Sequence, residues 1–170
     1  GSINGFHGSF SIAVRAYAYI KALGLEGLQS VSENAIINAN YIQTNLRDKY
    51  NLPADRYCMH ETVLSASRQK DRGIAGLDIA KRLLDFGIHA PTMYFPMIVD
   101  EALMIEPTES ESKDTLDHFI AVMRQIDDET NNNAELVSEA PHDLPVTRLD
   151  EASAARKPIL RWSPVDSDDQ

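Results

Sequence analysis

The feature that most constrains the fold is an alternation along the chain between apolar stripes with helical spacing and short apolar runs. Residues 11–23 carry a helical stripe that stops at Gly24, and residues 28–50 carry a longer one that stops before Pro53. A helix with one apolar stripe must bury that stripe against another element. The pattern therefore predicts a layered domain in which helices pack on a sheet.

Three short segments have the composition of β-strands. Residues 59–67 include Thr62, Val63 and Leu64, which favour a pleated and half-buried surface. Residues 93–95 and 103–105 are apolar runs separated by a proline and an acidic turn, which predicts an antiparallel pair. The fold class predicted is α+β, with a small antiparallel or mixed sheet of about three strands covered by helices.

Shorter helices are predicted around these strands. Residues 68–76 are expected to form a polar loop, followed by a helix over residues 77–84 that ends at Gly87. A brief helical stretch is predicted over residues 135–139.

A longer helix is predicted over residues 110–128. Thr108 and Glu111 have the spacing of a capping box, in which each side chain bonds to the other residue's backbone N–H. The expected buried stripe consists of Leu116, Phe119, Ile120, Met123 and Ile126.

Composition narrows the classes of partner. The chain of 170 residues has 16 basic and 26 acidic side chains, a formal charge of −10, which argues against general binding to nucleic acid or to an anionic membrane. Its apolar runs are far shorter than the roughly 20 residues of a membrane helix. The single cysteine, Cys58, has no partner for an internal disulfide, which suits a reducing cytoplasm.

The composition changes after residue 140. We expect residues 1–140 to form the domain and residues 141–170 to form an extended tail, too polar to build a core alone. Ile159, Leu160 and Trp162 form an apolar cluster in the tail, which either packs on the domain's own surface or docks on another subunit. Residues 166–170 are expected to be disordered.

Patterns for several kinds of site are missing from the sequence. The five histidines and the cysteine lack metal-ligand spacing, so no metal site is expected. No phosphate-binding P-loop and no nucleophile-elbow serine occurs. Cys58 and His60 would share one face of a strand, but no third residue is available to orient them as a catalytic pair.

Several motifs together resemble one enzyme family. The chain is similar to the C-terminal part of the pyridoxal-phosphate-dependent glycine decarboxylase, the P-protein of the glycine cleavage system, and more narrowly to the second subunit of its two-subunit bacterial form. The motifs that carry this resemblance are Cys58-Met59-His60-Glu61, residues 77–83, residues 87–111, residues 145–151 and residues 155–162.

The resemblance implies a fold and a function. The fold would be the C-terminal small domain of a fold-type I pyridoxal-phosphate enzyme, which closes one side of the active-site cleft. The family decarboxylates glycine and passes its aminomethyl group to the lipoyl arm of H-protein, in the cytoplasm. The implied partners are the chain's own upstream large domain, P-protein subunit 1, H-protein and glycine.

The same resemblance implies that this chain is inactive alone. The family holds pyridoxal phosphate as a Schiff base to a lysine in the large domain, which is N-terminal to the matched region. None of the six lysines here lies in a His-Lys motif followed by a glycine-rich loop. We therefore expect no catalytic residue within this chain. The alternative function is a stand-alone, non-catalytic α+β binding or oligomerisation module.

Gly8 and Ser9 are the candidates for a cofactor contact. They precede a predicted helix, where free backbone N–H groups favour an anion. The resemblance implies that such a segment reaches the phosphate of pyridoxal phosphate. The alternative is that Ser9 simply caps the helix.

His60, His89 and Thr92 are the candidates for lining the cleft. His60 and Glu61 would begin a strand and face opposite sides, so only one of them would point into a cleft. Local hydrogen bonding for His60 and a fixed turn around His89 and Thr92 are the alternatives. The resemblance would allow a small-domain arginine to bind the substrate carboxylate, but neither Arg15 nor Arg68 is assigned that role.

Overall fold

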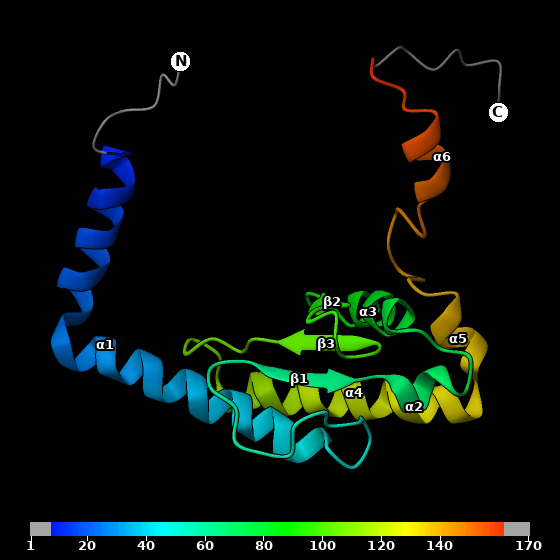
Figure 1. The fold of residues 1–170 in the computed structure, drawn as a ribbon, viewed down its shortest axis with the longest axis horizontal. Helices are drawn as coiled ribbons and strands as arrows, with labels where there is room; N and C mark the ends of the chain where they lie inside the picture. The colour runs from blue at the N-terminus through cyan, green and yellow to red at the C-terminus, as the bar shows by residue number, and fades with distance from the viewer. Residues whose placement is uncertain (1–7, 162–170) are drawn as a thin grey trace.

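The computed structural model describes residues 8–161 and has an α+β body with two projecting ends (Figure 1). The body contains a small sheet with helices packed against it. The N-terminal half of the first helix projects from one end of the body, and a C-terminal segment projects from the other. The predicted fold class is confirmed.

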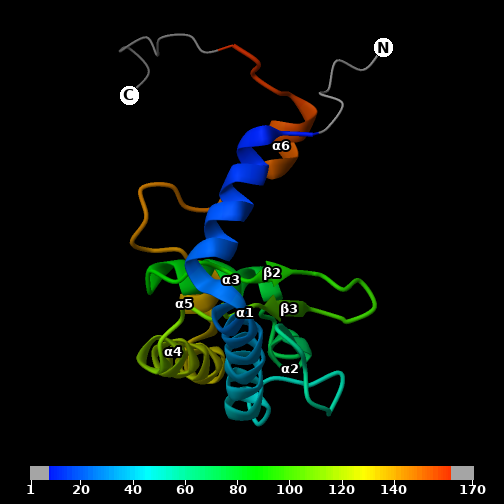
Figure 2. The same ribbon diagram turned by 90° about the vertical axis from the view of Figure 1, so that its left-hand side faces the viewer.

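The helix α1 (Phe10–Leu46) is bent at Gly24, whose backbone has φ 65° and ψ −173°. Glycine adopts a positive φ without the steric cost that a Cβ would add. The predicted break at Gly24 is therefore confirmed, although the second half ends at Leu46 rather than at residue 50. This half runs along the body, whereas the first half leaves it (Figure 2). No helix within residues 8–161 combines the length and apolar character needed to span a membrane.

The sheet contains β1 (Thr62–Ser65), β2 (Thr92–Met93) and β3 (Ala102–Ile105) in the order β1-β3-β2. Both pairings are antiparallel, with Leu64 and Met93 each opposite Leu103. The predicted pairing between the second and third strands is therefore confirmed.

Two strands are shorter than predicted. The backbone of Cys58 is bound by Asn40 of α1, whose side chain accepts from the Cys58 N–H and donates to the Cys58 carbonyl. This attachment keeps the segment before Thr62 out of the sheet. The second strand ends at Met93 because Tyr94 has a positive φ of 58°.

Five further helices follow α1 within residues 8–161, and the last of them lies in the projecting C-terminal segment (Figure 1). They are α2 (Ser67–Lys70), α3 (Gly76–Asp85), α4 (Lys113–Asn132), α5 (Ala134–Ser138) and α6 (Glu151–Arg156). The helix α2 and the buried Gln69 and Ile74 lie where a polar loop was predicted, so that prediction was wrong. The helix α6 was not predicted either.

The core lies between the sheet and two helices that run side by side, α4 and the second half of α1 (Figures 1 and 2). The predicted stripe of α4 is confirmed, because its four aliphatic members are buried and Phe119 is partly buried. The innermost residues include Ile42, Leu46, Leu64, Leu103, Met123 and Ile126.

A buried polar cluster joins α2 to α4. Asp127 is 4 % exposed. Its carboxylate accepts hydrogen bonds from Gln69 at 2.7 Å and from Arg72 at 2.6 Å. Lys49 lies 3.2 Å from the same carboxylate. Burial alone would raise the pKa of Asp127, but these three donors outweigh it and the pKa is lowered. The carboxylate is therefore charged and paired at neutral pH.

The tail is held to the body over its first residues. The carboxylate of Asp85 accepts from the backbone N–H groups of His142 and Asp143, and Arg148 pairs with Asp78 at 2.7 Å. Beyond these contacts, Ile159 and Leu160 are exposed, so they do not pack on the domain's own surface.

Some predictions fall on residues outside the described part of the chain. They concern Trp162 and the expected disorder of residues 166–170. The boundary between a domain of residues 1–140 and a tail of residues 141–170 stays a prediction.

The start of α4 differs from the prediction. Its N-cap is Ser112, whose hydroxyl accepts from the Thr115 N–H at 3.1 Å. The hydroxyl of Thr108 instead bonds to that of Ser110. The predicted capping box between Thr108 and Glu111 was therefore wrong, because the chain makes a further turn before the helix begins.

The variant Ser112→Ala tests this start directly. We expect it to lower the free energy of unfolding by about 1 kcal/mol, because it removes the acceptor of an otherwise unpaired helix N–H. The matched control Thr108→Ala should change that free energy by less than about 0.5 kcal/mol. Urea unfolding followed by circular dichroism measures both. A larger loss from Thr108→Ala than from Ser112→Ala would contradict the assignment.

Candidate functional site

A groove of about 620 Å³ lies beside the sheet. One wall is the segment of residues 86–92, which runs from the end of α3 into β2, and a second is the end of β3 with the turn that follows. The first turns of α4 close the groove. Segments far apart in the sequence therefore meet at one place.

The course of the first wall is set by how α3 ends. Gly87 has φ 70°, and its N–H bonds to the Leu84 carbonyl while the Ile88 N–H bonds to the Leu83 carbonyl. This pair of bonds is the Schellman arrangement that reverses the chain after a helix. The predicted end of the helix at Gly87 is confirmed, and the reversal directs the next residues along the groove.

The polar groups of the groove are histidines, hydroxyls and carboxylates. His89 and Thr92 come from the first wall, Glu106 from the turn after β3, and Thr115 and His118 from α4. Among the described residues, no lysine or arginine lines the groove. Such a surface suits proton exchange and hydrogen bonding to a neutral or cationic group, and it is poorly suited to holding a phosphate.

His60 lies in a neighbouring hollow of about 360 Å³, and Glu106 and Pro107 line both hollows. The His60 Nε2 atom is 3.8 Å from a Glu61 carboxylate oxygen and 4.0 Å from one of Glu106. His60 and Glu61 precede β1, so the expectation that they begin a strand and face opposite sides was wrong. The structure therefore brings His89 and Thr92 together and places His60 across the shared edge.

Gly8 and Ser9 directly precede α1 at the tip of its projecting half, and neither lines either hollow. Ser9 occupies the N-cap position, but its hydroxyl bonds to the Ser11 hydroxyl and caps no backbone N–H. The alternative of side-chain capping by Ser9 was therefore wrong. The cofactor role of the two residues stays a prediction.

Three lysines of the body are held in ion pairs. Lys49 pairs with Asp127 and Asp128, and Lys70 pairs with Asp100 and Glu101. The hydrogen bonds that both amines donate to these carboxylates raise the pKa of each amine. Lys113 is paired with Asp117, and its pKa is also raised. A lysine that attacks a carbonyl must lose its proton, so these amines are unsuited to that chemistry.

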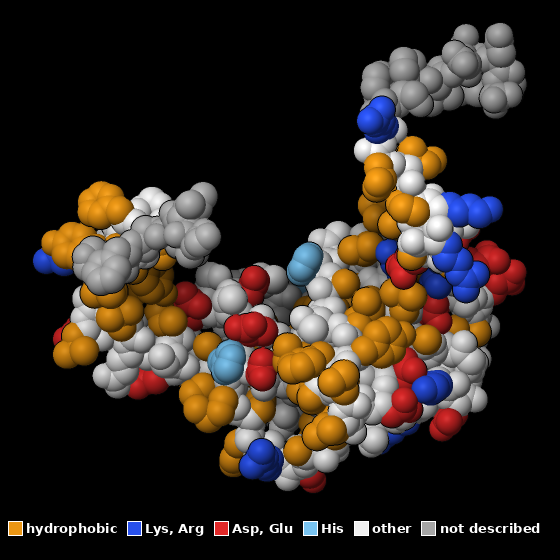
Figure 3. Space-filling model, turned by 45° about the horizontal axis from the view of Figure 1, so that its top comes forward, with side chains coloured by type: hydrophobic (Ala, Val, Ile, Leu, Met, Phe, Trp, Pro, Cys, Tyr) orange, Lys and Arg blue, Asp and Glu red, His pale blue; other side chains and the backbone are white. Residues whose placement is uncertain are grey.

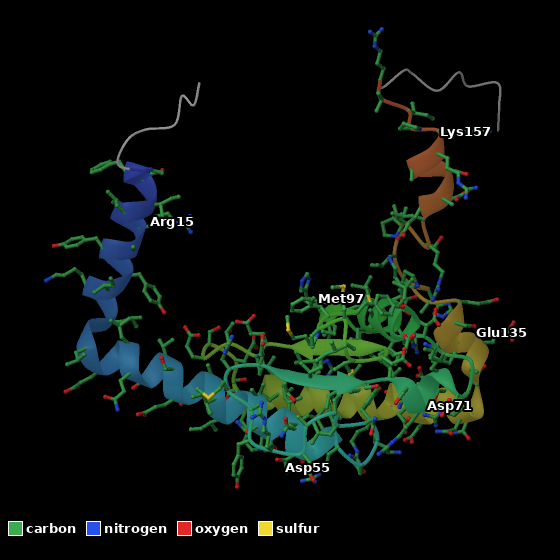
Figure 4. The ribbon with its side chains drawn as sticks, in the orientation of Figure 1. Arg15, Asp55, Asp71, Met97, Glu135 and Lys157 are labelled. Carbon is green, nitrogen blue, oxygen red and sulfur yellow. The ribbon has the colours of Figure 1, made fainter. Side chains whose placement is uncertain are left out.

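The other candidates from the sequence have structural roles or none. Burial raises the pKa of the Cys58 thiol, which disfavours the reactive thiolate. Arg68 donates to the Asp48 carbonyl, and Arg15 lies on the projecting half of α1 (Figure 4). Within residues 8–161 there is no group of three or more His, Cys, Asp or Glu arranged for a metal ion.

Sequence reasoning missed two features of the site. His118 lies one helical turn after Thr115, a spacing that could have placed both on one side of α4. Arg82 bonds to Glu129 and to Asp85 while its guanidinium lies 4.8 Å from the centre of the Phe86 ring. This contact fixes Phe86, a groove residue, to α4 through side chains that no sequence motif marks.

The family model described as "Glycine dehydrogenase, C-terminal domain" matches residues 31–145. The match includes both walls of the groove. The chain belongs to this family. Its two hollows are therefore features of a glycine dehydrogenase C-terminal domain.

Relatives extend the match over nearly the whole chain. A Staphylococcus haemolyticus protein is 56% identical over 162 residues, and a Bacillus cytotoxicus protein is 58% identical over 162 residues. Each alignment covers 95% of this chain and 33% of the relative. An Oceanobacillus iheyensis protein is 56% identical over 164 residues, covering 96% of this chain and 34% of the relative. All three are described as "Probable glycine dehydrogenase (decarboxylating) subunit 2", so the chain spans about a third of their length.

The Asp85 carboxylate that supports the groove should make stability depend on pH. Burial alone would raise the pKa of Asp85, but the N–H groups of Asp143 and His142 and the Arg82 guanidinium outweigh it, and the pKa is lowered. A lowered pKa in the folded state contributes stability above the unfolded value of about 3.9, and this stability is lost as pH falls through the folded pKa.

We therefore expect Asp85→Asn to lower the free energy of unfolding by about 2 kcal/mol at pH 7. Below about pH 4, the free energy of unfolding of this variant should decrease less than that of the unmodified chain. The control Asp143→Asn keeps the backbone donor and should leave both quantities unchanged. Urea unfolding across pH provides the measurement. Equal pH profiles for the unmodified chain and Asp85→Asn would contradict the role of this carboxylate.

Proposed function

We propose that this chain is the C-terminal small domain of a glycine decarboxylase subunit and that the 620 Å³ groove forms part of one wall of the catalytic cleft. Membership of the family and the names of the relatives support the reaction class. The reaction would decarboxylate glycine and transfer an aminomethyl group to the lipoyl arm of H-protein.

The proposal depends mainly on where the segments of one motif lie in the structure. Residues 87–92 and 104–107 both belong to the motif of residues 87–111, one of those that carry the resemblance, and they meet at the same groove. Neither segment forms the centre of the core, and His89 and Thr92 are exposed. Polar residues held at a groove by a rigid support are typical of binding and catalytic surfaces.

Pyridoxal phosphate would supply the electron sink for decarboxylation when it is bound in the full-length enzyme. The described residues do not fit its covalent attachment, because no lysine lines the groove and three lysines are held in ion pairs. The attaching lysine would come from another part of the enzyme. Gly8 and Ser9 remain our proposal for a phosphate contact at the tip of α1.

The groove residues would act on the substrate side of the cleft. Thr92 and Thr115 offer hydroxyls for hydrogen bonds, and His89 offers its imidazole ring nitrogens as a donor and an acceptor. His60 would act in the neighbouring hollow, next to Glu106, which lines both hollows.

The proposed partners follow from the names of the relatives and from the family. They are subunit 1, the upstream large domain, lipoylated H-protein and glycine, in the cytoplasm. The second candidate function is a non-catalytic binding or oligomerisation module, which the lack of a groove lysine favours for the isolated chain.

The absorption band of bound pyridoxal phosphate tests the proposal. We expect no specific band when the cofactor is mixed with the purified chain, and a clear band for the full-length subunit paired with subunit 1. Reduction with borohydride, digestion and mass spectrometry would locate any attached lysine. A stoichiometric band from the chain alone would contradict the assignment of the lysine to another part of the enzyme. No band from the complete assembly would contradict the proposed cofactor.

A further inference from the structure

The first half of α1 is an apolar helix with little to pack against in the described structure. We call residues 10–23 the N-terminal arm. Six of its large apolar side chains are exposed, among them Phe10 at 82 % and Tyr17 at 66 %. Figure 3 shows hydrophobic side chains gathered on this arm, which stands away from the body. Exposed apolar surface of this kind marks an interaction site.

The apolar side chains of the arm lie on two opposite faces. Phe10, Val14 and Tyr17 follow the spacing i, i+4 and i+7 and form the first face. The second face is rotated by about half a turn at 100° per residue and contains Ile12, Tyr19, Ile20 and Leu23. The residues of both faces are exposed except Leu23, which is half-buried. A helix that pairs with one other helix needs only one such face, whereas a helix apolar on opposite sides is surrounded by a core.

The polar residues of the arm agree with a buried setting. Ser11, Arg15 and Lys21 are its polar side chains, and the arm has no acidic residue, although the whole chain has a net charge of −10. Long basic side chains can cover apolar surface while their charged ends reach solvent. Figure 4 shows Arg15 on the arm, far from the body.

The comparisons indicate which part of the protein would cover the arm. The match of the family model begins at residue 31, so the arm lies outside the matched region. The alignment with the Staphylococcus haemolyticus relative nevertheless covers 162 of the 170 residues, which is too many for the arm to be left out. The arm is therefore shared with proteins about three times as long. Because the matched family model describes a C-terminal domain, the arm, which precedes that match, lies on the side of the upstream part of those proteins.

We infer that the N-terminal arm is a core helix of the upstream part of the same subunit, inserted between two apolar layers there. The bend at Gly24 is then the boundary at which the chain passes from that upstream domain to the C-terminal domain. This inference rests on the proposed function only in identifying the part of the protein that covers the arm. It also moves the start of the folded C-terminal domain from residue 1 to about residue 24.

Hydrogen–deuterium exchange tests the inference on proteins as they exist. The 170-residue chain is compared with the full-length subunit that contains it, and peptides spanning residues 10–23 are followed. We expect exchange of the arm to be slower by about 100-fold or more in the full-length subunit, because its amides then open only with a folded domain. Peptides from α4 should exchange similarly in both proteins. Equally fast exchange of the arm in both proteins would overturn the inference.

Charged variants on each face distinguish the upstream domain from other structures that could cover the arm. Tyr17→Lys disrupts the first face, Ile20→Lys disrupts the second, and Ser11→Lys, which lies between them, is the matched control. We expect both face variants to lower the thermal midpoint of the full-length subunit, and none of the three to lower that of the 170-residue chain. The control should leave both midpoints unchanged.

Two other outcomes would overturn the inference that the upstream domain covers the arm. If only one face variant lowers the midpoint of the full-length subunit, the arm lies on a surface instead of in a core. If light scattering shows that the chain forms a dimer that one face variant dissociates, the occupant is a second copy. Glycine decarboxylation is assayed separately, so a protected arm in an inactive assembly would overturn the proposed function alone.

Discussion

The body depends on the packing of α4 and the second half of α1 against the inner face of the sheet. Its strands have four, two and four residues, too few for the sheet to be stable alone. Leu64 and Leu103 stand opposite each other on β1 and β3 and are fully buried. Val63 and Met104 are paired on the other face and are only half-buried, so the helices provide most of the core.

Buried carboxylates attach the remaining segments to this core. Asp127 joins α2 to α4, and Asp85 holds the first residues of the tail. Glu101 accepts from the Gly76 N–H at 2.7 Å at the start of α3, and pairs with Lys70 at 2.9 Å. The groove lies between elements fixed in this way, so its polar residues can face solvent without loss of stability.

The sequence predicted the features that depend on periodicity and on glycine. The stripe of α4, the break at Gly24, the end of α3 at Gly87 and the antiparallel pairing near Leu103 all follow from local pattern. Predictions failed where a distant residue decides the outcome. Asn40 keeps the segment after Cys58 out of the sheet, and Asp127 draws Gln69 into the interior. At the groove, His89 and Thr92 belong to a motif that the sequence marks, whereas the only local signal for His118 is its spacing from Thr115 on α4.

The central claim is that the groove faces the reaction of the full-length enzyme. Its most direct test is kcat/KM for glycine decarboxylation by the full-length subunit with subunit 1 and H-protein, comparing His89→Ala and Thr92→Ala with the exposed control Ser110→Ala. Our account predicts a loss of about tenfold or more for the groove variants, with unchanged thermal midpoints and an unaffected control. Unchanged kcat/KM in both groove variants would contradict it.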